Sequence, residues 1–115
     1  GEEGESLHHM MRNLEIERLT LAAMSVGLAK RSLEIMTRYA EERKAFGKPL
    51  KAFGQIQRHI AESYAEYRAA RCYLYETARR LDLAQEGNRI DSDGVKLFAS
   101  EVGKRIADRA MQVLG

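Results

Sequence analysis

Proline is almost absent from this chain, and its absence constrains the fold more than any other feature of the sequence. The 115 residues contain one proline, Pro49, and none interrupts the stretch from Ser6 to Arg43. Because proline breaks the hydrogen-bond ladder of a helix interior, such a stretch can form one long helix. The residues that dominate the chain, chiefly Ala, Leu, Glu, Arg and Met, are strong helix formers. The sequence therefore predicts an all-α protein.

Apolar residues recur every three or four positions in three separate stretches, which is the period of a helix. The sets are Leu19, Ala22, Val26, Ala29, Leu33 and Met36; Ile56, Ile60, Tyr64, Tyr67, Leu74, Ala78 and Leu81; and Val95, Phe98, Val102, Ile106, Ala110 and Val113. We expect helices at about 6–42, 54–86 and 91–114, with Asp91 or Ser92 capping the third. Long helices with short connections pack antiparallel. The expected fold is therefore an up-down bundle of three helices, an incomplete four-helix bundle that forms a single domain over residues 1–115.

The first expected helix carries a second apolar stripe and two glutamates in different surroundings. The stripe consists of Met10, Leu14, Leu21 and Met24, so we expect this helix to be covered on two sides. Glu15 has an arginine three residues away on each side, which favours a paired, solvated carboxylate. Glu17 lies within the stripe and has no cation three or four residues away. A carboxylate in such surroundings loses hydration and becomes a better proton acceptor. Glu17 is thus a candidate base; exposure at a helix edge, or a cation from another helix, is the alternative.

The segment between the first two helices breaks the helical period and contains the only proline. Three basic residues surround Phe46 and Gly47 in it: Arg43, Lys44 and Lys48. Arginine binds phosphate through two parallel hydrogen bonds, glycine lets backbone approach a ligand, and phenylalanine offers a stacking face. This composition suits a nucleotide diphosphate. An ordinary basic connection between helices is the competing interpretation.

Several classes of protein are disfavoured by the totals. Nineteen basic and seventeen acidic residues leave a net charge of +2, which does not favour nucleic-acid binding, and no long apolar run predicts a membrane span. His8 and His9 are adjacent and diverge on a helix, so we expect no metal site. Cys72 is the only cysteine; we expect it to be a small buried residue in a reducing compartment. The mitochondrial matrix and the bacterial cytoplasm both fit.

Three stretches of the chain together resemble the C-terminal domain of the acyl-CoA dehydrogenases. They read LEIERLTLAAMSVGLAKRSLEIMTRYAEERKAFGKPL, then QIQRHIAESYAEYRAAR, then VKLFAS and QVLG. RYAEERKAFGKP and QVLG are the most specific parts. The likeness implies that FAD and an acyl-CoA lie between an N-terminal helical domain, a middle β-domain and this bundle. The chain stops at Gly115, so we expect it to be the first three helices of that domain and to be inactive alone.

The resemblance also implies roles for individual residues. Arg43 and Phe46 would contact the diphosphate and adenine of FAD in a neighbouring subunit, and Gln112 would contact the same cofactor. Gly54 departs from the family pattern, which usually has a glutamine there to bind adenine. Homo-oligomers, tetramers or dimers, and an electron-transfer flavoprotein as partner are implied as well.

The reaction that the resemblance implies is α,β-dehydrogenation of an acyl-CoA thioester, with a glutamate as the base. A minority of members, including the isovaleryl-CoA and long-chain branches, carry this glutamate on the first helix of the domain, directly before an arginine. Glu17 and Arg18 match that position, which suggests a short branched acyl chain. Leu7, Met11, Glu15 and Arg18 would lie beside the substrate. The alternatives are plain core packing for Leu7 and Met11 and an ion pair with Glu15 for Arg18.

Two other functions remain open on the sequence. The first is a helical interaction module without catalysis, since open bundle faces are natural oligomer surfaces. The second is an acyl-CoA oxidase, which shares these residues. A pure scaffold needs neither a carboxylate in an apolar stripe nor the basic segment around Phe46.

Overall fold

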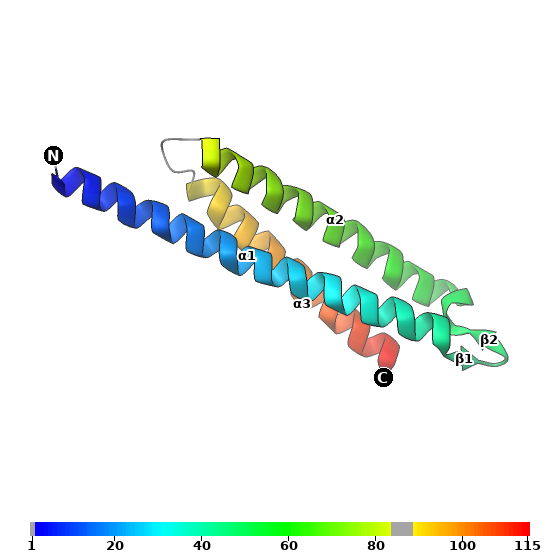
Figure 1. Cartoon of the computed structure of the whole chain (residues 1–115). Coiled ribbons are helices and arrows are strands. Elements are labelled where there is room, and N and C mark those ends of the chain that lie inside the picture. Colours follow the sequence, from blue (N-terminus) through cyan, green and yellow to red (C-terminus); the bar gives the residue numbers. More distant parts are fainter. Residues whose placement is uncertain (1, 84–88) are drawn as a thin grey trace.

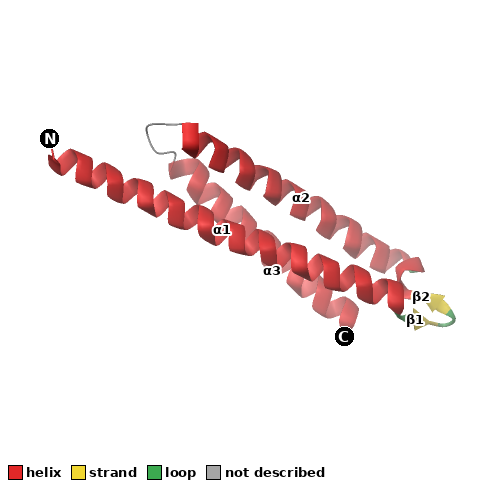
Figure 2. Ribbon diagram, in the orientation of Figure 1, coloured by secondary structure: helices red, strands yellow, loops and turns green. Residues whose placement is uncertain are grey.

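A computed structural model describes residues 2–83 and 89–115 and shows a long three-helix bundle (Figure 1). The chain runs through α1 (Glu2–Glu42), a hairpin of β1 (Lys44–Ala45) and β2 (Lys48–Pro49), a 3-10 turn (Leu50–Ala52), α2 (Gly54–Leu83) and α3 (Arg89–Leu114). Apart from the small hairpin, the described elements are helical (Figure 2). The prediction of an all-α, up-down bundle is confirmed.

The element boundaries differ from the expected ones at three places. Helix α1 begins at Glu2, earlier than expected. Residues 84–86, the expected end of the second helix, lie outside the described residues. Helix α3 already begins at Arg89, so Asp91 lies in its first turn and the prediction that Asp91 or Ser92 caps the helix is wrong. An acidic side chain in the first turn still interacts favourably with the helix dipole.

The hairpin between α1 and α2 was not foreseen in the sequence. Lys44 pairs with Pro49 and Ala45 with Lys48 in an antiparallel arrangement. The two residues at the tip, Phe46 and Gly47, have φ values of 54° and 78°. Two consecutive positive φ values are typical of the tight turns that join strands in hairpins. Strands of two residues are too short to show an alternating pattern, which is why the sequence did not reveal them.

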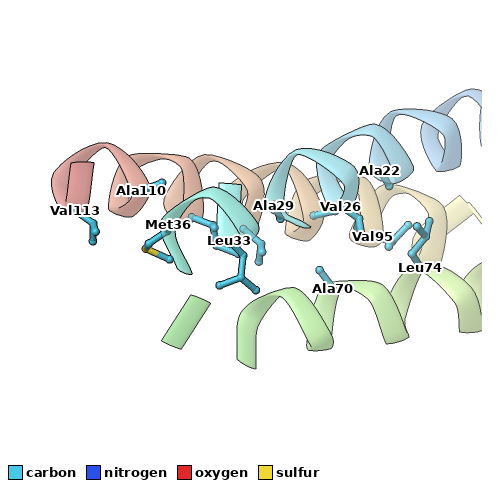
Figure 3. Packing of buried hydrophobic residues seen from close by; sticks show 13 residues of the cluster. Ala22, Val26, Ala29, Leu33, Met36, Ala70, Leu74, Val95, Ala110 and Val113 are labelled. Atoms are coloured by element: carbon cyan, nitrogen blue, oxygen red, sulfur yellow. The ribbon is translucent and has the colours of Figure 1, made fainter. Parts of the chain in front are cut away.

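The core consists of one face from each helix (Figure 3). The expected apolar sets of α1 and α3 are buried, with Leu19 and Phe98 only partly covered. Small residues bring α1 and α3 close together: Ala22, Ala29 and Ala99 are fully buried, and a Cβ on Gly103 would lie 2.9 Å from the Ser25 carbonyl oxygen. Glycine at this position therefore permits a close approach of two backbones.

Helix α2 packs on the α1–α3 pair through a narrower face than its sequence suggests. Tyr67 and Tyr73 pack against the core, and the Tyr73 and Phe98 rings lie 6.1 Å apart between centroids. Tyr64, which belongs to the apolar set expected for this helix, is exposed, and so is Tyr75. The prediction that Cys72 is buried is also wrong. At 100° per residue, Cys72 points away from the side of α2 that carries the core residues.

The bundle is a rod of about 72 × 20 × 16 Å with a radius of gyration of 18.4 Å. A compact domain of this length has a radius of gyration of about 13 Å. Within the described residues, no helix has both the length and the apolar character needed to cross a bilayer. The elongated shape leaves much of each helix uncovered, and most of the candidate functional residues, though not Glu15, lie on these uncovered surfaces.

Candidate functional site

Glu17 lies on an exposed side of α1, surrounded by apolar side chains. Its neighbours along the helix, Met10, Leu14, Leu21 and Met24, have exposed fractions of 58, 42, 46 and 67%. We call these five residues the Glu17 stripe. The apolar surroundings of Glu17 are as expected, but the prediction that both sides of this helix are covered is wrong for the described chain. Because α1 packs on α2 and α3 through its other face, the stripe remains free to contact a ligand or another domain.

Glu15 is buried, which contradicts the prediction of a paired, solvated carboxylate. It is 2% exposed, and its Oε2 atom has no hydrogen-bond partner among the described residues. The physical reason is its helical phase: Glu15 continues the buried set of Leu19, Ala22 and Val26 at steps of four, three and four, so it points toward the interior of the bundle. The spacing of Glu15 from the core residues would have predicted its burial, whereas its spacing from the two arginines did not.

Arg18 pairs across the bundle and not with Glu15. Its Nε atom lies 2.5 Å from Oδ1 of Asp93, in the second turn of α3. The Arg18 side chain is 22% exposed and that of Asp93 is 49% exposed. The role of Asp93 could not be predicted from the sequence, because residues so far apart in the chain leave no local signal of a contact.

A small cavity of about 50 Å³ brings together three of the residues expected beside the substrate. Met11, Glu15 and Arg18 line it with Leu14. The remaining residue of that set, Leu7, is exposed on α1 about one turn before Met11. The cavity thus joins an apolar wall, a cation and a carboxylate next to the Glu17 stripe.

The basic segment forms the hairpin, and its tip projects from the end of the bundle. Phe46 is 96% exposed at a positive φ, a backbone conformation that costs a non-glycine residue free energy and that clusters at functional sites. The Arg43 guanidinium lies 5.2 Å from the centroid of the Tyr39 ring, a cation–π arrangement that orients it. The i, i+4 spacing of Tyr39 and Arg43 would have revealed this contact. Arg43, Lys44 and Lys48 are exposed and remain available to an anion.

Gln112 lies in the last turns of α3, exposed to solvent. The C-terminal end of α3 points toward the end of the bundle that carries the hairpin (Figure 1). Arg43, Phe46 and Gln112 therefore lie toward the same end, which we call the hairpin end. Their side chains fit a flavin dinucleotide in kind: a guanidinium for the diphosphate, an aromatic face for adenine and an amide for hydrogen bonds.

The Glu17 stripe and the hairpin end are far apart. Helix α1 is continuous from Glu17 to Glu42, and Arg43 follows it directly. At about 1.5 Å of rise per residue, Glu17 and Arg43 are about 39 Å apart along the helix. The described structure thus presents two separate surfaces on one rod.

Comparison with known proteins identifies the family. The family model "Acyl-CoA dehydrogenase, C-terminal domain" matches residues 5–115. Over its whole length the chain is 38% identical to the mitochondrial isovaleryl-CoA dehydrogenase of Oryza sativa subsp. japonica, of which it covers 28%. It is 34% identical to the cyclohexane-1-carbonyl-CoA dehydrogenase of Geobacter metallireducens, of which it covers 30%.

Solved structures agree with the sequence comparison. The structure of a glutaryl-coenzyme A dehydrogenase in complex with glutaryl-CoA superposes with a TM-score of 0.88 at 36% identity, over 92% of this chain and 27% of that one. The chain therefore spans less than a third of the length of these relatives. On the match of nearly its whole length, the chain belongs to the acyl-CoA dehydrogenase family and corresponds to its C-terminal helical domain.

Proposed function

We propose that the chain is part of an FAD-dependent acyl-CoA dehydrogenase and that Glu17 is its base. The observation that carries this proposal is the Glu17 carboxylate within an exposed apolar stripe. If another domain and an acyl-CoA cover the stripe, water is excluded around a carboxylate that forms no ion pair with the residues the structure describes. Such a group accepts a proton from carbon more readily than a hydrated one does.

In this proposal the residues around Glu17 bind and orient the thioester. Glu17 removes the proton from the α-carbon, and FAD, when bound, supplies the acceptor for the β-hydrogen as hydride. Leu7 and Met11 form an apolar wall for the pantetheine arm. Glu15 Oε2, which has no partner among the described residues, accepts a hydrogen bond from a donor group of that arm, and Arg18 orients the turn through Asp93.

The hairpin end would hold a different flavin from the one that Glu17 serves. The reactive ring and the diphosphate of one FAD are joined by a single ribityl chain, which does not extend over about 39 Å of helix. Arg43, Phe46 and Gln112 would therefore bind the diphosphate and adenine of FAD in a neighbouring subunit. This arrangement requires a homo-oligomer, a dimer or tetramer, built through the bundle. Gly54 offers no side chain to the adenine.

The relatives suggest the substrate and the setting. Several are named for branched or cyclic acyl groups, and the rice protein for isovaleryl-CoA. We propose a short branched acyl-CoA as substrate and an electron-transfer flavoprotein as electron acceptor. The location would be the mitochondrial matrix in a eukaryote and the cytoplasm in a bacterium.

The test is anaerobic bleaching of the flavin in the full-length enzyme on addition of isovaleryl-CoA. We expect Glu17→Gln to slow bleaching by a factor of about 10² or more, because proton abstraction loses its base. Glu34→Gln is the matched control, since Glu34 is an exposed glutamate on another side of the same helix. It should bleach at the wild-type rate.

The other outcomes separate the alternatives. Bleaching of Glu17→Gln at the wild-type rate would move the base to another residue while keeping the dehydrogenase. A preference for butyryl-CoA would contradict the branched substrate. Rapid flavin reoxidation by oxygen after reduction would favour an acyl-CoA oxidase. A flavin-loaded wild type that no acyl-CoA bleaches would favour a non-catalytic helical module.

A further inference from the structure

Helices α2 and α3 are joined by a two-pronged ion pair between Glu66 and Arg109. Nη1 of Arg109 lies 2.7 Å from Oε2 of Glu66, and Nη2 lies 3.1 Å from Oε1. Nη1 also donates to the hydroxyl of the buried Ser63 at 3.4 Å. We call the Glu66–Arg109 contact the fork. Two parallel bonds to a planar guanidinium fix direction as well as distance, which a single ion pair does not.

The fork is better shielded than the other ion pairs of α2. The side chains of Arg109 and Glu66 are 16 and 27% exposed, whereas those of Glu76 and Arg79 are 48 and 59% exposed. The Arg109 hydrogen bonds lower the pKa of Glu66, and Glu66 in turn raises the pKa of Arg109. Both groups therefore stay charged at neutral pH, and the contact persists there.

The fork lies on the helices that lead to the hairpin end. Arg109 lies three residues before Gln112, so a rigid turn of α3 joins the two. Glu66 lies in the half of α2 that follows the hairpin. The α2 and α3 helices run antiparallel, so the fork links the Gln112 end of α3 to the helix that continues from Phe46 and Arg43 (Figure 1).

Apolar packing alone does not fix the register of α3. Ile106, Ala110 and Val113 hold this part of α3 in the core, but apolar contacts have no direction and tolerate small rotations and translations. The two short bonds between Arg109 and Glu66 favour one register, because the neighbouring contacts are longer: Arg109 Nη2 lies 3.6 Å from Glu62 Oε2, and Arg105 Nε lies 3.4 Å from Glu66 Oε2. Loss of the fork leaves α3 packed yet free to shift at the end where Gln112 lies.

We propose that Glu66 and Arg109 are positioning residues that hold Gln112 in register with the hairpin, so that the hairpin end binds the flavin nucleotide as one preorganised surface. This inference rests on the proposed function. It assigns the two residues no contact with the cofactor. Their effect is on the affinity for FAD and not on the chemical step, which belongs to the Glu17 stripe.

The experiment measures FAD affinity by reconstituting the full-length apoenzyme. We expect Glu66→Gln to weaken FAD binding about tenfold and to leave the bleaching rate of the FAD-saturated enzyme unchanged. Arg109→Lys should have a similar effect, because lysine keeps the charge but cannot form two parallel bonds. Glu76→Gln is the matched control. Glu76 accepts bonds from Arg79 and Arg80, but all three residues lie within α2, so FAD affinity should be unchanged.

A double-mutant cycle with Gln112→Ala separates positioning from general destabilisation. If the fork acts through Gln112, Glu66→Gln has no further effect on FAD affinity once Gln112 is alanine. Full additivity of the two losses, or an unchanged affinity in Glu66→Gln alone, would overturn the proposal. If Gln112→Ala itself leaves FAD affinity unchanged, the cofactor role of Gln112 fails first, and the inference fails with it.

Discussion

A carboxylate oxygen enclosed without a hydrogen-bond donor destabilises a folded protein, and Glu15 Oε2 is in that position among the described residues. Its neighbours in the cavity are two apolar side chains and Arg18, whose guanidinium is bound to Asp93. Buried polar atoms without a partner are rare in native proteins, and a functional role is one of their explanations. The position of Glu15 therefore agrees with a role in binding.

Replacing Glu15 with methionine should separate a role in binding from a role in folding. Glu15→Met keeps an unbranched side chain of similar size and removes the unpaired oxygen, so we expect the free energy of unfolding of the chain to rise by about 1–3 kcal/mol. Urea unfolding followed by circular dichroism measures it. In the full-length enzyme the same variant should raise the KM for acyl-CoA. A loss of stability would show that Glu15 is a structural residue.

At this scale the sequence reveals some site residues and hides others. The apolar surroundings of Glu17 follow from positions three and four residues away on its own helix, and the structure has them on one side of α1. Glu15 was misjudged because its two neighbouring arginines were weighed instead of its spacing from the core residues Ala22 and Val26, which places it on the buried face of α1.

At the scale of the elements, the most extensive contact in the bundle is the one between α1 and α3. Alanines line it, and Gly103 faces the Ser25 carbonyl oxygen. The apolar spacing predicts most of the large buried residues of these two helices, but it missed smaller or polar buried ones such as Ala40, Ser92 and Ala99. The distance of closest approach does not follow from spacing, because it depends on which small residues meet across the interface.

Two glycine substitutions test this contact with opposite expectations. Gly103→Ala places a methyl group 2.9 Å from a backbone oxygen, which forces the helices apart and should destabilise the chain by about 1–3 kcal/mol. Gly27→Ala lies in α1 with nothing within 4 Å of its added Cβ, so it should stabilise by about 0.5–1 kcal/mol through helix propensity. Urea midpoints of both variants measure the difference. Equal effects would contradict the close approach.

Acid should weaken the contact between α2 and α3. The fork lowers the pKa of Glu66, so the folded state binds fewer protons there than the unfolded state. Its stabilisation is fully present above the unfolded pKa of about 4.3 and is lost as the pH falls through the lower folded pKa. We expect the stability difference between wild type and Glu66→Gln to be largest near neutrality and to vanish in strong acid. Urea midpoints across this pH range measure it, and a difference that is constant with pH would contradict the assignment.

At the scale of the whole molecule, apolar surface extends over much of the rod. Besides the Glu17 stripe, grooves of about 460 and 480 Å³ run between α1 and α2, and one of about 440 Å³ runs between α1 and α3. Their walls are mostly apolar. The helices and their order could be predicted from the sequence. Which apolar faces remain exposed could not, because an amphipathic pattern marks a face that favours burial but does not identify the element that buries it.

The isolated chain should therefore self-associate. We expect light scattering to give a mass above the monomer that rises with concentration, because exposed apolar faces pair in water. Met24→Glu with Leu28→Glu should lower the association, since both residues line the α1–α3 groove. Cys72→Ser is the control that excludes a disulfide between exposed cysteines. A monomer at all concentrations would count against open faces of this extent.

The length of α1 determines how a substitution in one subunit affects the active sites of an oligomer. If one end of the rod contacts the chain's own flavin and the other contacts the flavin of a neighbouring subunit, each subunit contributes residues to two active sites. An oligomer that mixes subunits substituted at Glu17 with subunits substituted at Arg43 would then contain some active sites with both substitutions and others with neither. Two inactive proteins would in this way produce an active one, and the phenotype of a heterozygote would not be the average of its alleles.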